Sequence, residues 1–566
     1  MYNPASMEKQ MTEALSDQSS KVAPFAPIWI VAFSGHRMKP GSPGRSRDEI
    51  MACGPVLQSV LSSLKDQAKE HNGTIELIAS TADGADLLAI DTAKELGIPV
   101  HLILPMPIES FKADFATSDS GQSWATVLKH IETAQDPHSL WTYRIAFGDN
   151  TRPDCYHESN LQMLECADVL VTICTAQEAA SSNPSIGSTA ETIRIASKEH
   201  RNVPTIQIDP SKNAIVTRRD SWTIQNAGID RLNEINKDLT SKHAADSHSR
   251  PQRTGEDPIW CAHKALDNVA NRYGDWFRQN FIMSIWLHFG ATVFAATTAA
   301  YLIKHKGYGI SMALTALELL LVLIATCLVF MSRRSLSNTI WRRTRFGAEL
   351  IDSQVHSAGF VDPLRPLSMS RSIAWRRFAL VVGLSAHRQQ SIRVADLDSQ
   401  SGFEIAKQSY LKDRVARQIQ YLSTKQKKAA ARFHLCSLIS KVVSVAAIIA
   451  IAAALKHKVD LWLGSQEYGY TKPFLGEYFT ATYVYYLPIL LPLIAGLASS
   501  IIVVSDSARR ASRYKQLKDR LESYQRTVPA IRTVSAMRRV VIEIEDALLD
   551  EMNEWHATAE NLEHMH

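Results

Sequence analysis

The chain has 566 residues, with 62 lysine and arginine residues against 57 aspartate and glutamate residues and a formal net charge of +5. Apolar residues make up 45% of the chain and charged residues 21%, which excludes a chain that is disordered as a whole. So small a charge over this length argues against a dedicated nucleic-acid binder, and we expect neither a DNA nor an RNA partner. The seven cysteines have no CxxC or zinc-ribbon spacing. We therefore expect free thiols in a reducing compartment and no metal site.

The N-terminal part of the chain begins with polar residues and then alternates short apolar runs with helical patterns. The polar residues lack the basic-then-apolar order of a signal peptide, which predicts a disordered tail over residues 1–25. The alternation over residues 26–240 predicts an α/β domain with a parallel sheet of Rossmann type. The expected strands are 28–33, 75–79, 100–104, 168–174 and 205–208, and the expected helices include 56–69, 85–96 and 189–198.

Three glycine-containing turns follow expected strands or open expected helices of this domain. The first strand runs into Gly35–Arg37, the second leads to Gly84–Asp86, and a later helix begins at Gly187–Thr189 with Glu191 one turn in. Glycine lets a backbone approach a ligand, arginine offers a fork of donors to phosphate, and helix N-termini attract anions. Each turn alone is an ordinary connection, but three in one predicted sheet favour a phosphate-bearing ligand. No GxGxxG or Walker A motif is present, which argues against a dehydrogenase or a P-loop enzyme.

The order of these motifs resembles the SLOG superfamily, which includes the Lonely Guy cytokinin-activating enzymes and the DNA-processing protein DprA. The resemblance covers about 180 residues and implies binding of a nucleotide-derived ligand. Its motifs are Gly35-His36-Arg37, Gly84-Ala85-Asp86 with Ala89 and Ala93, Leu104-Pro105 with Phe111 and Asp114-Phe115, Asn160 and Asp168, and Gly187-Ser188-Thr189. The ligand-binding residues that we expect are Gly35, His36, Arg37, Gly84, Ala85, Asp86, Pro105, Asn160, Gly187, Ser188, Thr189 and Glu191.

One motif departs from the enzymes of that superfamily. Lonely Guy enzymes carry P-G-G-x-G-T-x-x-E, whose glutamate supports cleavage of a nucleotide N-glycosidic bond. The segment Pro184–Glu191 lacks the double glycine and is one residue shorter. We therefore expect binding without turnover, no catalytic residue and no cofactor. The alternative is a membrane-tethered N-glycosidase or hydrolase of nucleotides or NAD-related compounds that uses Glu191 or Asp86.

The second half of the chain contains apolar runs that are long enough to cross a bilayer. Residues 241–257 precede them as an expected flexible linker. Residues 281–302 and 310–331 form two runs, and the second contains Glu318 as its one charged residue. A weaker pair follows at 438–455 and 487–504. We predict an all-α membrane region with four transmembrane helices in two hairpins, divided into two-helix units at 258–400 and 401–566.

Basic residues flank both predicted hairpins on the same side. They are Arg333, Arg334, Arg342, Arg343 and Arg345 after the first hairpin, Lys425, Lys427, Lys428 and Arg432 before the second, and Arg509, Arg510, Arg513 and Lys515 after it. By the positive-inside rule, both hairpins start and end in the cytoplasm. The N- and C-termini are then cytoplasmic.

Polar residues share faces within the first two predicted spans. Ser284, His288 and Thr292 recur at every fourth residue, and Thr315 and Glu318 lie three residues apart. Polar groups inside a membrane are costly, so we expect these residues to line a pore or its gate. The alternative is hydrogen bonding between helices in a static bundle.

The paired two-helix units with basic flanks resemble the SLATT effector domain. A SLOG domain fused to SLATT is similar to predicted bacterial antiviral effectors. In such a protein, the soluble domain senses a nucleotide second messenger made by a separate synthase, for example a cyclic oligonucleotide or an ADP-ribose derivative. The membrane part, as a homo-oligomer, permeabilises the inner membrane and arrests growth. A regulated transporter is a third interpretation, but the repeats share one orientation and carry few polar residues for a solute site.

Overall fold

The computed structural model describes residues 25–38, 45–115, 121–136, 139–146, 151–198, 203–212, 215–218, 228–241, 258–304, 308–334, 337–364, 373–391, 400–462, 486–505 and 507–564. Apart from Phe25 and Ser241, the predicted tail and linker lie outside these residues. The chain divides into two compact units, each made of three segments. The α/β unit comprises Met1–His263, Ala348–Gln408 and Arg532–Asp550, and the helical unit comprises Lys264–Gly347, Ser409–Ile531 and Glu551–His566.

A seven-stranded sheet forms the centre of the α/β unit. Its strand order is β4-β3-β2-β1-β5-β6-β7, in which six strands are parallel and β7 pairs antiparallel with β6. The predicted parallel sheet of Rossmann type is confirmed, and β4 and β7 are additions to it. The strands are β1 (Ile28–Gly35), β2 (Thr74–Ala79), β3 (Val100–Leu104), β4 (Thr142–Ile145), β5 (Val169–Ile173), β6 (Thr205–Asp209) and β7 (Ile215–Arg218).

Helices cover both faces of this sheet, as parallel strands with apolar residues on both sides require. Trp29, Val31 and Phe33 of β1 face one layer, and the alternating Ile30 and Ala32 face the other. The first layer contains α3 (Gly54–Glu70), α4 (Ala85–Glu95) and α6 (Gly121–Gln135), and the second contains α7 (Arg152–Cys166), α9 (Thr189–Lys198) and α15 (Ile373–Ser391). This unit also contains the short helices α2 (Arg47–Met51), α5 (Ile108–Lys112), α8 (Ala176–Ala179) and α10 (Ile229–Leu239), with the 3-10 turns η1 (Ala113–Phe115) and η2 (Pro210–Lys212), and parts of longer helices that continue into the helical unit.

Three arginines attach α15 to the amino edge of the sheet. Arg376 donates to the carbonyl oxygens of Cys166 at 2.7 Å and Ala167 at 3.1 Å. Arg377 donates to both carboxylate oxygens of Asp168, at 2.8 and 3.1 Å, and to the carbonyl oxygen of Ile28 at 2.6 Å. Arg388 donates to the buried carboxylate of Glu76 at 2.9 Å. Residues 258–400 were predicted to form one membrane unit, but α15 packs on the sheet and this segment contributes to both compact units.

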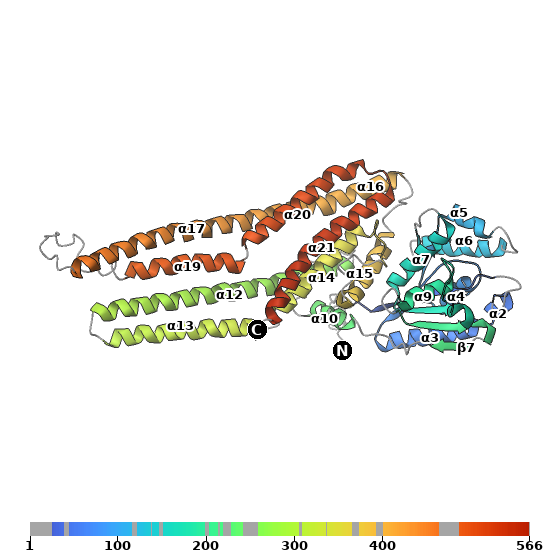
Figure 1. The fold of residues 1–566 in the computed structure, drawn as a ribbon, viewed down its shortest axis with the longest axis horizontal. Coiled ribbons are helices and arrows are strands. Elements are labelled where there is room, and N and C mark those ends of the chain that lie inside the picture. Colours follow the sequence, from blue (N-terminus) through green and yellow to red (C-terminus); the bar gives the residue numbers. More distant parts are fainter. Residues whose placement is uncertain are drawn as a thin grey trace, which may run out of the picture. The chain divides into compact units, whose positions relative to one another are not determined.

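Long helices make up the helical unit. Figure 1 shows α12 beside α13 and α17 beside α19, and described contacts join the members of each pair. The helices with residues in this unit are α12 (Pro258–Lys304), α13 (Tyr308–Arg334), α14 (Ser337–Ser357), the π-helical turn η5 (Leu411–Ala416), α17 (Arg417–Trp462), α19 (Leu487–Ser505), α20 (Ser507–Thr527), the 3-10 turn η7 (Val528–Ala530) and α21 (Val534–His564). The helix α16 (Gln400–Tyr410) precedes η5.

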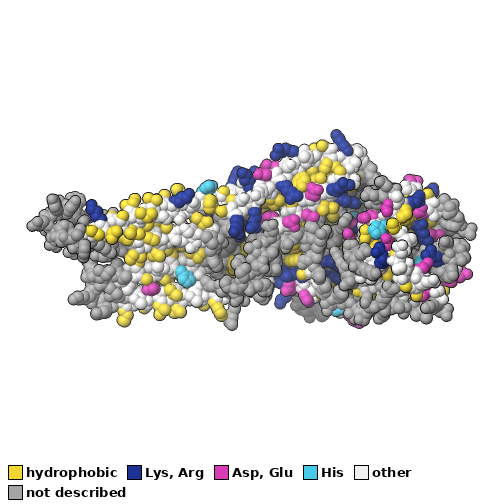
Figure 2. Space-filling model, in the orientation of Figure 1, with side chains coloured by type: hydrophobic (Ala, Val, Ile, Leu, Met, Phe, Trp, Pro, Cys, Tyr) yellow, Lys and Arg dark blue, Asp and Glu magenta, His cyan; other side chains and the backbone are white. Residues whose placement is uncertain are grey.

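Two helical stretches among the described residues are long and apolar enough to cross a membrane. They are Pro258–Thr298 and Gln400–Lys456, which contain most of the first predicted span and all of the third. Met312–Leu328 and Leu487–Ile502 are shorter apolar stretches within the other two. Many apolar side chains of α17 are exposed, and Figure 2 shows hydrophobic side chains spread over the surface of these long helices. Length, composition and exposure therefore indicate membrane association for this unit.

Candidate functional site

The three predicted glycine turns meet at the carboxyl edge of the sheet, at the end of β1. The backbone N–H of Gly35 donates to Asp86 Oδ1 at 3.0 Å, and Thr189 Oγ1 donates to the carbonyl oxygen of Gly35 at 2.9 Å. Ser34 Oγ donates to Thr189 Oγ1 at 3.4 Å. The strand order reverses between β1 and β5, and this edge is where sheets of this topology bind ligands. The structure thus brings the first, second and third motifs together at the switch point.

Two of the glycines allow close packing of one chain segment on another. A Cβ on Gly35 would lie 2.3 Å from the Cβ of Ala85, the first residue of α4. Gly84 has φ +116°, and its Cβ would lie 2.7 Å from the carbonyl oxygen of His36. Ala85 N–H donates to that same oxygen at 3.1 Å. No side chain fits at either position, so both glycines have a structural reason that holds without a ligand.

Asp86 is buried beneath this turn. One carboxylate oxygen accepts from Gly35 N–H and the other from Ala82 N–H at 3.3 Å. Burial raises the pKa of Asp86 to about 7, against the effect of these bonds and of Arg37. Its carboxyl group therefore ties the end of β1 to the turn before α4.

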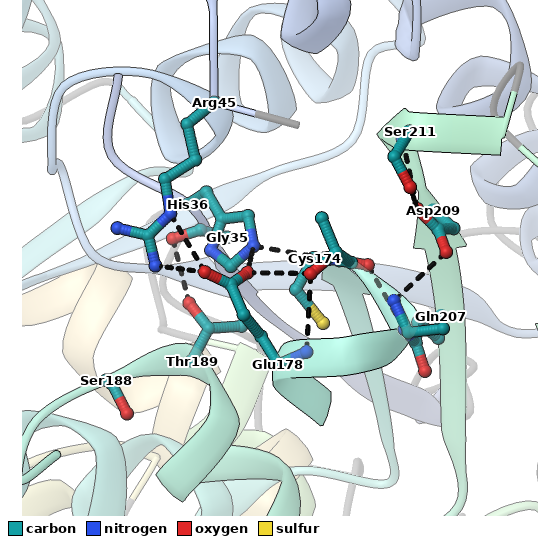
Figure 3. Close-up of polar contacts among 12 residues, drawn as sticks. Gly35, His36, Arg45, Cys174, Glu178, Ser188, Thr189, Gln207, Asp209 and Ser211 are labelled. Atoms are coloured by element: carbon teal, nitrogen blue, oxygen red, sulfur yellow. Dashed lines mark hydrogen bonds and ion pairs between the residues drawn. The ribbon is translucent and has the colours of Figure 1, made fainter. Parts of the chain in front are cut away.

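A second group of polar side chains lies beside Gly35, on the β5 side (Figure 3). His36 Nε2 contacts the carboxylate of Glu178, and Thr175 N–H donates to the same nitrogen at 3.2 Å. Arg45 donates to Glu178 Oε1 through Nε at 3.1 Å and Nη2 at 2.5 Å. Burial lowers the pKa of His36, although Glu178 acts in the opposite direction. An arginine fork, a carboxylate and a buried imidazole thus form one connected network.

The loop after β5 and the end of β6 hold this network in place. Asp209 Oδ2 accepts from Ala176 N–H at 3.0 Å, and its other oxygen accepts from the N–H and Oγ of Ser211 (Figure 3). Thr175 Oγ1 accepts from Glu178 N–H at 3.3 Å and so caps α8. Gln207 Nε2 donates to the carbonyl oxygen of Cys174 at 3.1 Å.

Four residues of this network were not predicted from the sequence: Arg45, Thr175, Glu178 and Asp209. A signal for two of them exists, because Thr175-Ala176-Gln177-Glu178 has the S/T-x-x-E spacing of a capping box directly after an expected strand. Arg45 precedes the short helix α2 and has no comparable motif. Its position beside Glu178 depends on contacts 133 residues apart in the chain.

Glu191 closes the third glycine turn from within. Its Oε2 accepts from Gly187 N–H at 2.5 Å and lies 3.1 Å from His157 Nδ1, and its N–H donates to Ser188 Oγ at 3.2 Å. Gly187 has φ +76°, and a Cβ there would lie 2.6 Å from Tyr156 Cβ. Glu191 is buried at 4% exposure. The carboxylate of Glu191 therefore stabilises the turn at the N-terminus of α9.

Arg37 is the predicted site residue most open to solvent, with 44% of its side chain exposed. Its guanidinium lies 4.4 Å from the ring centre of Tyr156 and 3.6 Å from Asp114 Oδ2. Asp114 also pairs with Arg152. Two arginines, each with nearly half of its side chain exposed, therefore share one carboxylate beside Tyr156.

The other predicted ligand residues lie apart from this network. Pro105 follows β3 and is buried, and Asn160 is buried on α7. No hydrogen bond or ion pair among the described residues joins either one to Gly35, Asp86 or Thr189.

Three of the five predicted pore-lining residues, all on α12, form hydrogen bonds within the first helical pair. Ser284 is buried and its Oγ donates to Ala325 O of α13 at 3.5 Å. Thr292 Oγ1 donates to His288 O at 2.7 Å, and His288 Nδ1 lies 2.9 Å from Ser284 O. Thr315 is exposed on α13 and Glu318 half-buried. The contact of Ser284 fits hydrogen bonding between helices, the alternative to a pore lining.

A cavity of about 510 Å³ lies at the opposite, amino edge of the sheet, within the α/β unit. Apolar side chains from β2, α12 and α15 line it, and Glu76 and Arg388 belong to its wall. These two pair with each other, and of the two lysines in the wall Lys65 donates to the carbonyl oxygen of Leu96 and Lys69 lies 3.4 Å from Asp66 Oδ1. The carboxyl edge therefore remains the better candidate for an anionic ligand.

Among the described residues, no group of three or more His, Cys, Asp or Glu side chains is arranged to hold a metal ion. Comparison with protein-family models, with curated proteins and with solved structures finds no match to this chain.

Proposed function

We propose that this chain is a membrane-bound bacterial effector of the antiviral type, whose α/β unit binds a nucleotide second messenger at the carboxyl edge of β1. On binding, the helical unit, assembled as a homo-oligomer, opens a pore in the inner membrane and stops growth. The observation that carries this proposal is the convergence of Arg37, Arg45 and the N-terminus of α9 on the switch point between β1 and β5. The motif order of the SLOG superfamily supports the same assignment.

Phosphate is the ligand group that suits these residues. The backbone N–H groups at the start of α9 carry partial positive charge, and Ser188 and Thr189 add hydroxyl groups. Arg45 now pairs with Glu178, and Arg37 lies near Asp114. A phosphate with two negative charges would compete with these single carboxylates for the same guanidinium groups. Such an exchange releases Glu178 and gives the bound and free states different contacts.

For the membrane part we propose that the shorter apolar stretches of α13 and α19 cross the bilayer with α12 and α17. Each is paired with a helix that is long enough to cross by itself. The spans of one chain pack in two pairs, α12 with α13 and α17 with α19, and we propose that several copies together enclose a water-filled path. The flanking arginine and lysine residues support a cytoplasmic position for both termini.

A second candidate is the membrane-tethered hydrolase of nucleotides or NAD-related compounds. The buried contact between His36 and Glu178, and the pKa of Asp86 near neutrality, are properties of groups that transfer protons. Against it, both oxygens of Asp86 accept backbone N–H groups, and Glu191 is engaged by Gly187 and His157. We therefore rank binding without turnover first.

The test uses the full chain, because α15 completes the second face of the sheet and a fragment ending at residue 240 would lack it. Detergent-solubilised protein is screened for thermal stabilisation by cyclic oligonucleotides, ADP-ribose derivatives and mononucleotides, and each mixture is checked for product by chromatography. We expect one class to stabilise the protein and to survive intact. The same compound should then release an entrapped dye from vesicles that contain the protein.

The variant Arg45→Gln removes a charged donor and should lower the affinity for that ligand by about 10- to 100-fold. Arg47→Gln, an exposed arginine two residues along, is the matched control and should bind as the wild type does. Equal affinity of Arg45→Gln and wild type would refute the site. Consumption of the compound would favour the hydrolase, with Glu191→Gln as the next variant.

A further inference from the structure

The surface of α17 changes from basic to apolar along its length. From Arg417 to Arg432 it carries five basic residues and no acidic residue. From Leu435 to Leu455 its one charged residue is Lys441, and apolar side chains such as Leu438 and Ile448 are more than half exposed. These 21 residues span roughly 31 Å at 1.5 Å per residue, which equals the hydrocarbon thickness of a bilayer.

The neighbouring helices α19 and α20 of the same chain also change from apolar to basic at this level. The helix α19 has no charged residue, whereas α20 has seven basic residues against two acidic ones and packs along α17. Ser440 Oγ of α17 lies 3.0 Å from Ser499 Oγ of α19. Since the helices run antiparallel, counting eight residues from this contact in each direction reaches Arg432 and Ser507. The basic part of α17 and the start of α20 therefore lie side by side.

We call Leu435–Leu455 of α17 together with α19 the apolar belt. The basic residues directly beyond it on α17 and α20 form what we call the basic collar (Figure 2). Its lysines on α17 are exposed to solvent, and the whole chain carries a net charge of only +5, so positive charge is concentrated here. The collar consists of Lys425, Lys427, Lys428 and Arg432 of α17 and of Arg509, Arg513 and Lys515 of α20.

We infer that the basic collar binds the headgroups of anionic phospholipids. This inference rests on the proposed insertion of the helical unit. The collar begins about 5 Å beyond one end of the apolar belt, at three residues and 1.5 Å per residue, which is where the headgroup phosphates of a bilayer lie. Lysine and arginine bring their charge to that level while their stems lie along apolar surface. Each lysine or arginine near an anionic leaflet raises the association constant for that leaflet by about fivefold.

The experiment measures lipid selectivity on the full chain in vesicles of phosphatidylcholine with 30% phosphatidylglycerol. Spin-labelled phosphatidylglycerol and phosphatidylcholine report how strongly each lipid associates with the protein. We expect a several-fold preference for the anionic lipid, which falls in 0.5 M salt because the charges are screened. The variant Lys425→Gln/Lys427→Gln/Lys428→Gln should reduce the preference to about one. The matched control Lys94→Gln/Lys112→Gln/Lys129→Gln removes the same charge from exposed helices of the α/β unit and should leave it unchanged.

The outcomes separate this inference from the proposed function. Protein that alkaline carbonate washes out of the vesicles is not inserted, which refutes both. Protein that stays inserted but associates equally with the two lipids refutes the collar alone. Loss of the preference on adding millimolar inorganic phosphate, or a short RNA, would assign the collar to a soluble polyanion and overturn the lipid assignment. A second variant, Arg509→Gln/Lys515→Gln, tests the α20 half and should lower the preference in the same direction.

Discussion

Replacing Arg377 with methionine should weaken the attachment of α15 to the sheet. Arg377 forms a two-point ion pair with Asp168, which also accepts from Ile30 N–H at 2.8 Å. Burial opposes ionisation, but Arg377 and Arg376 hold the pKa of Asp168 below its ordinary value. In the variant, the carboxylate of Asp168 keeps its hydrogen bond from Ile30 N–H and its contact with the more distant Arg376, at 3.6 Å. Removing one partner of a buried ion pair costs about 3–5 kcal/mol.

The assay is thermal unfolding of the full chain in detergent, followed by tryptophan fluorescence. A cost of 3–5 kcal/mol corresponds to a fall in Tm of roughly 4–7 °C for a unit of this size, at about 2.1 cal/mol/K of unfolding entropy per residue. Trp29 is a suitable reporter because it is fully buried, with the Arg377 guanidinium 5.0 Å from its ring centre. The control Arg47→Met changes an exposed arginine and should move the Tm by no more than 1–2 °C, since surface changes cost within about 0.5 kcal/mol.

Two further measurements make this reasoning refutable. Because the folded pKa of Asp168 is depressed, its stabilisation is present above pH 4 and is lost as the pH falls through the folded value. Arg377→Met should therefore flatten the acid side of the stability curve. The double variant Asp168→Asn/Arg377→Met should lose less than the sum of the two single variants. Additive losses, or an unchanged Tm in Arg377→Met, would show that the ion pair does not hold α15.

The remaining predictions concern the carboxyl edge. Gly84→Ala places a Cβ 2.7 Å from His36 O at φ +116°, so it should lower the free energy of unfolding by about 1–3 kcal/mol and weaken ligand binding. The control Gly97→Ala, at φ +65° in open space, should lower it by about 1 kcal/mol and leave binding unchanged. Thermal unfolding and ligand titration check both variants. Because the pKa of Asp86 is raised to about 7, the wild type should lose roughly 3 kcal/mol of stability from this group as the pH rises from 4 to 7. Asp86→Asn should lack that loss, and parallel pH slopes of the two proteins in denaturant unfolding would contradict the burial of an ionisable carboxyl.

Much of the sheet could be predicted, because consecutive apolar residues are typical of strands buried on both faces. The runs that formed β1, β2, β3, β5 and β6 have this pattern. The strand β4 has four half-buried residues that include Arg144, and β7 is a four-residue edge strand, so neither has an apolar run of useful length. Short strands of this kind depend on a neighbouring strand that local pattern does not reveal.

The position of α15 could not be read from local pattern either. Arg376 and Arg377 stand in a basic stretch after a predicted hairpin, where positive charge suits a membrane flank. Their partner Asp168 lies 209 residues earlier. Pairing across such a distance is decided by tertiary packing, here of Leu380, Val381 and Leu384 on the second face of the sheet.

At the candidate site, the glycine turns could be predicted but the charged partners could not. Gly35 and Gly84 lie where two chain segments approach closely, and only glycine fits there. Such a requirement can be recognised in the sequence as a glycine at the end of a strand or before a helix. The contact of Arg45 with Glu178 leaves no such mark, although the capping-box spacing after β5 marks Glu178 itself.

The pairing of Asp168 with Arg377 has a consequence for synthesis of the protein. A ribosome adds about 5–20 residues per second, so roughly 10–40 s separate the emergence of these two residues. The apolar stretches of α12 and α13 are made within that interval. During it, the face of the sheet that contains Ile30 and Ala32 lacks its α15 cover. Synthesis of the first helical pair thus precedes completion of the α/β unit, and a chaperone that shields this face would act in that window.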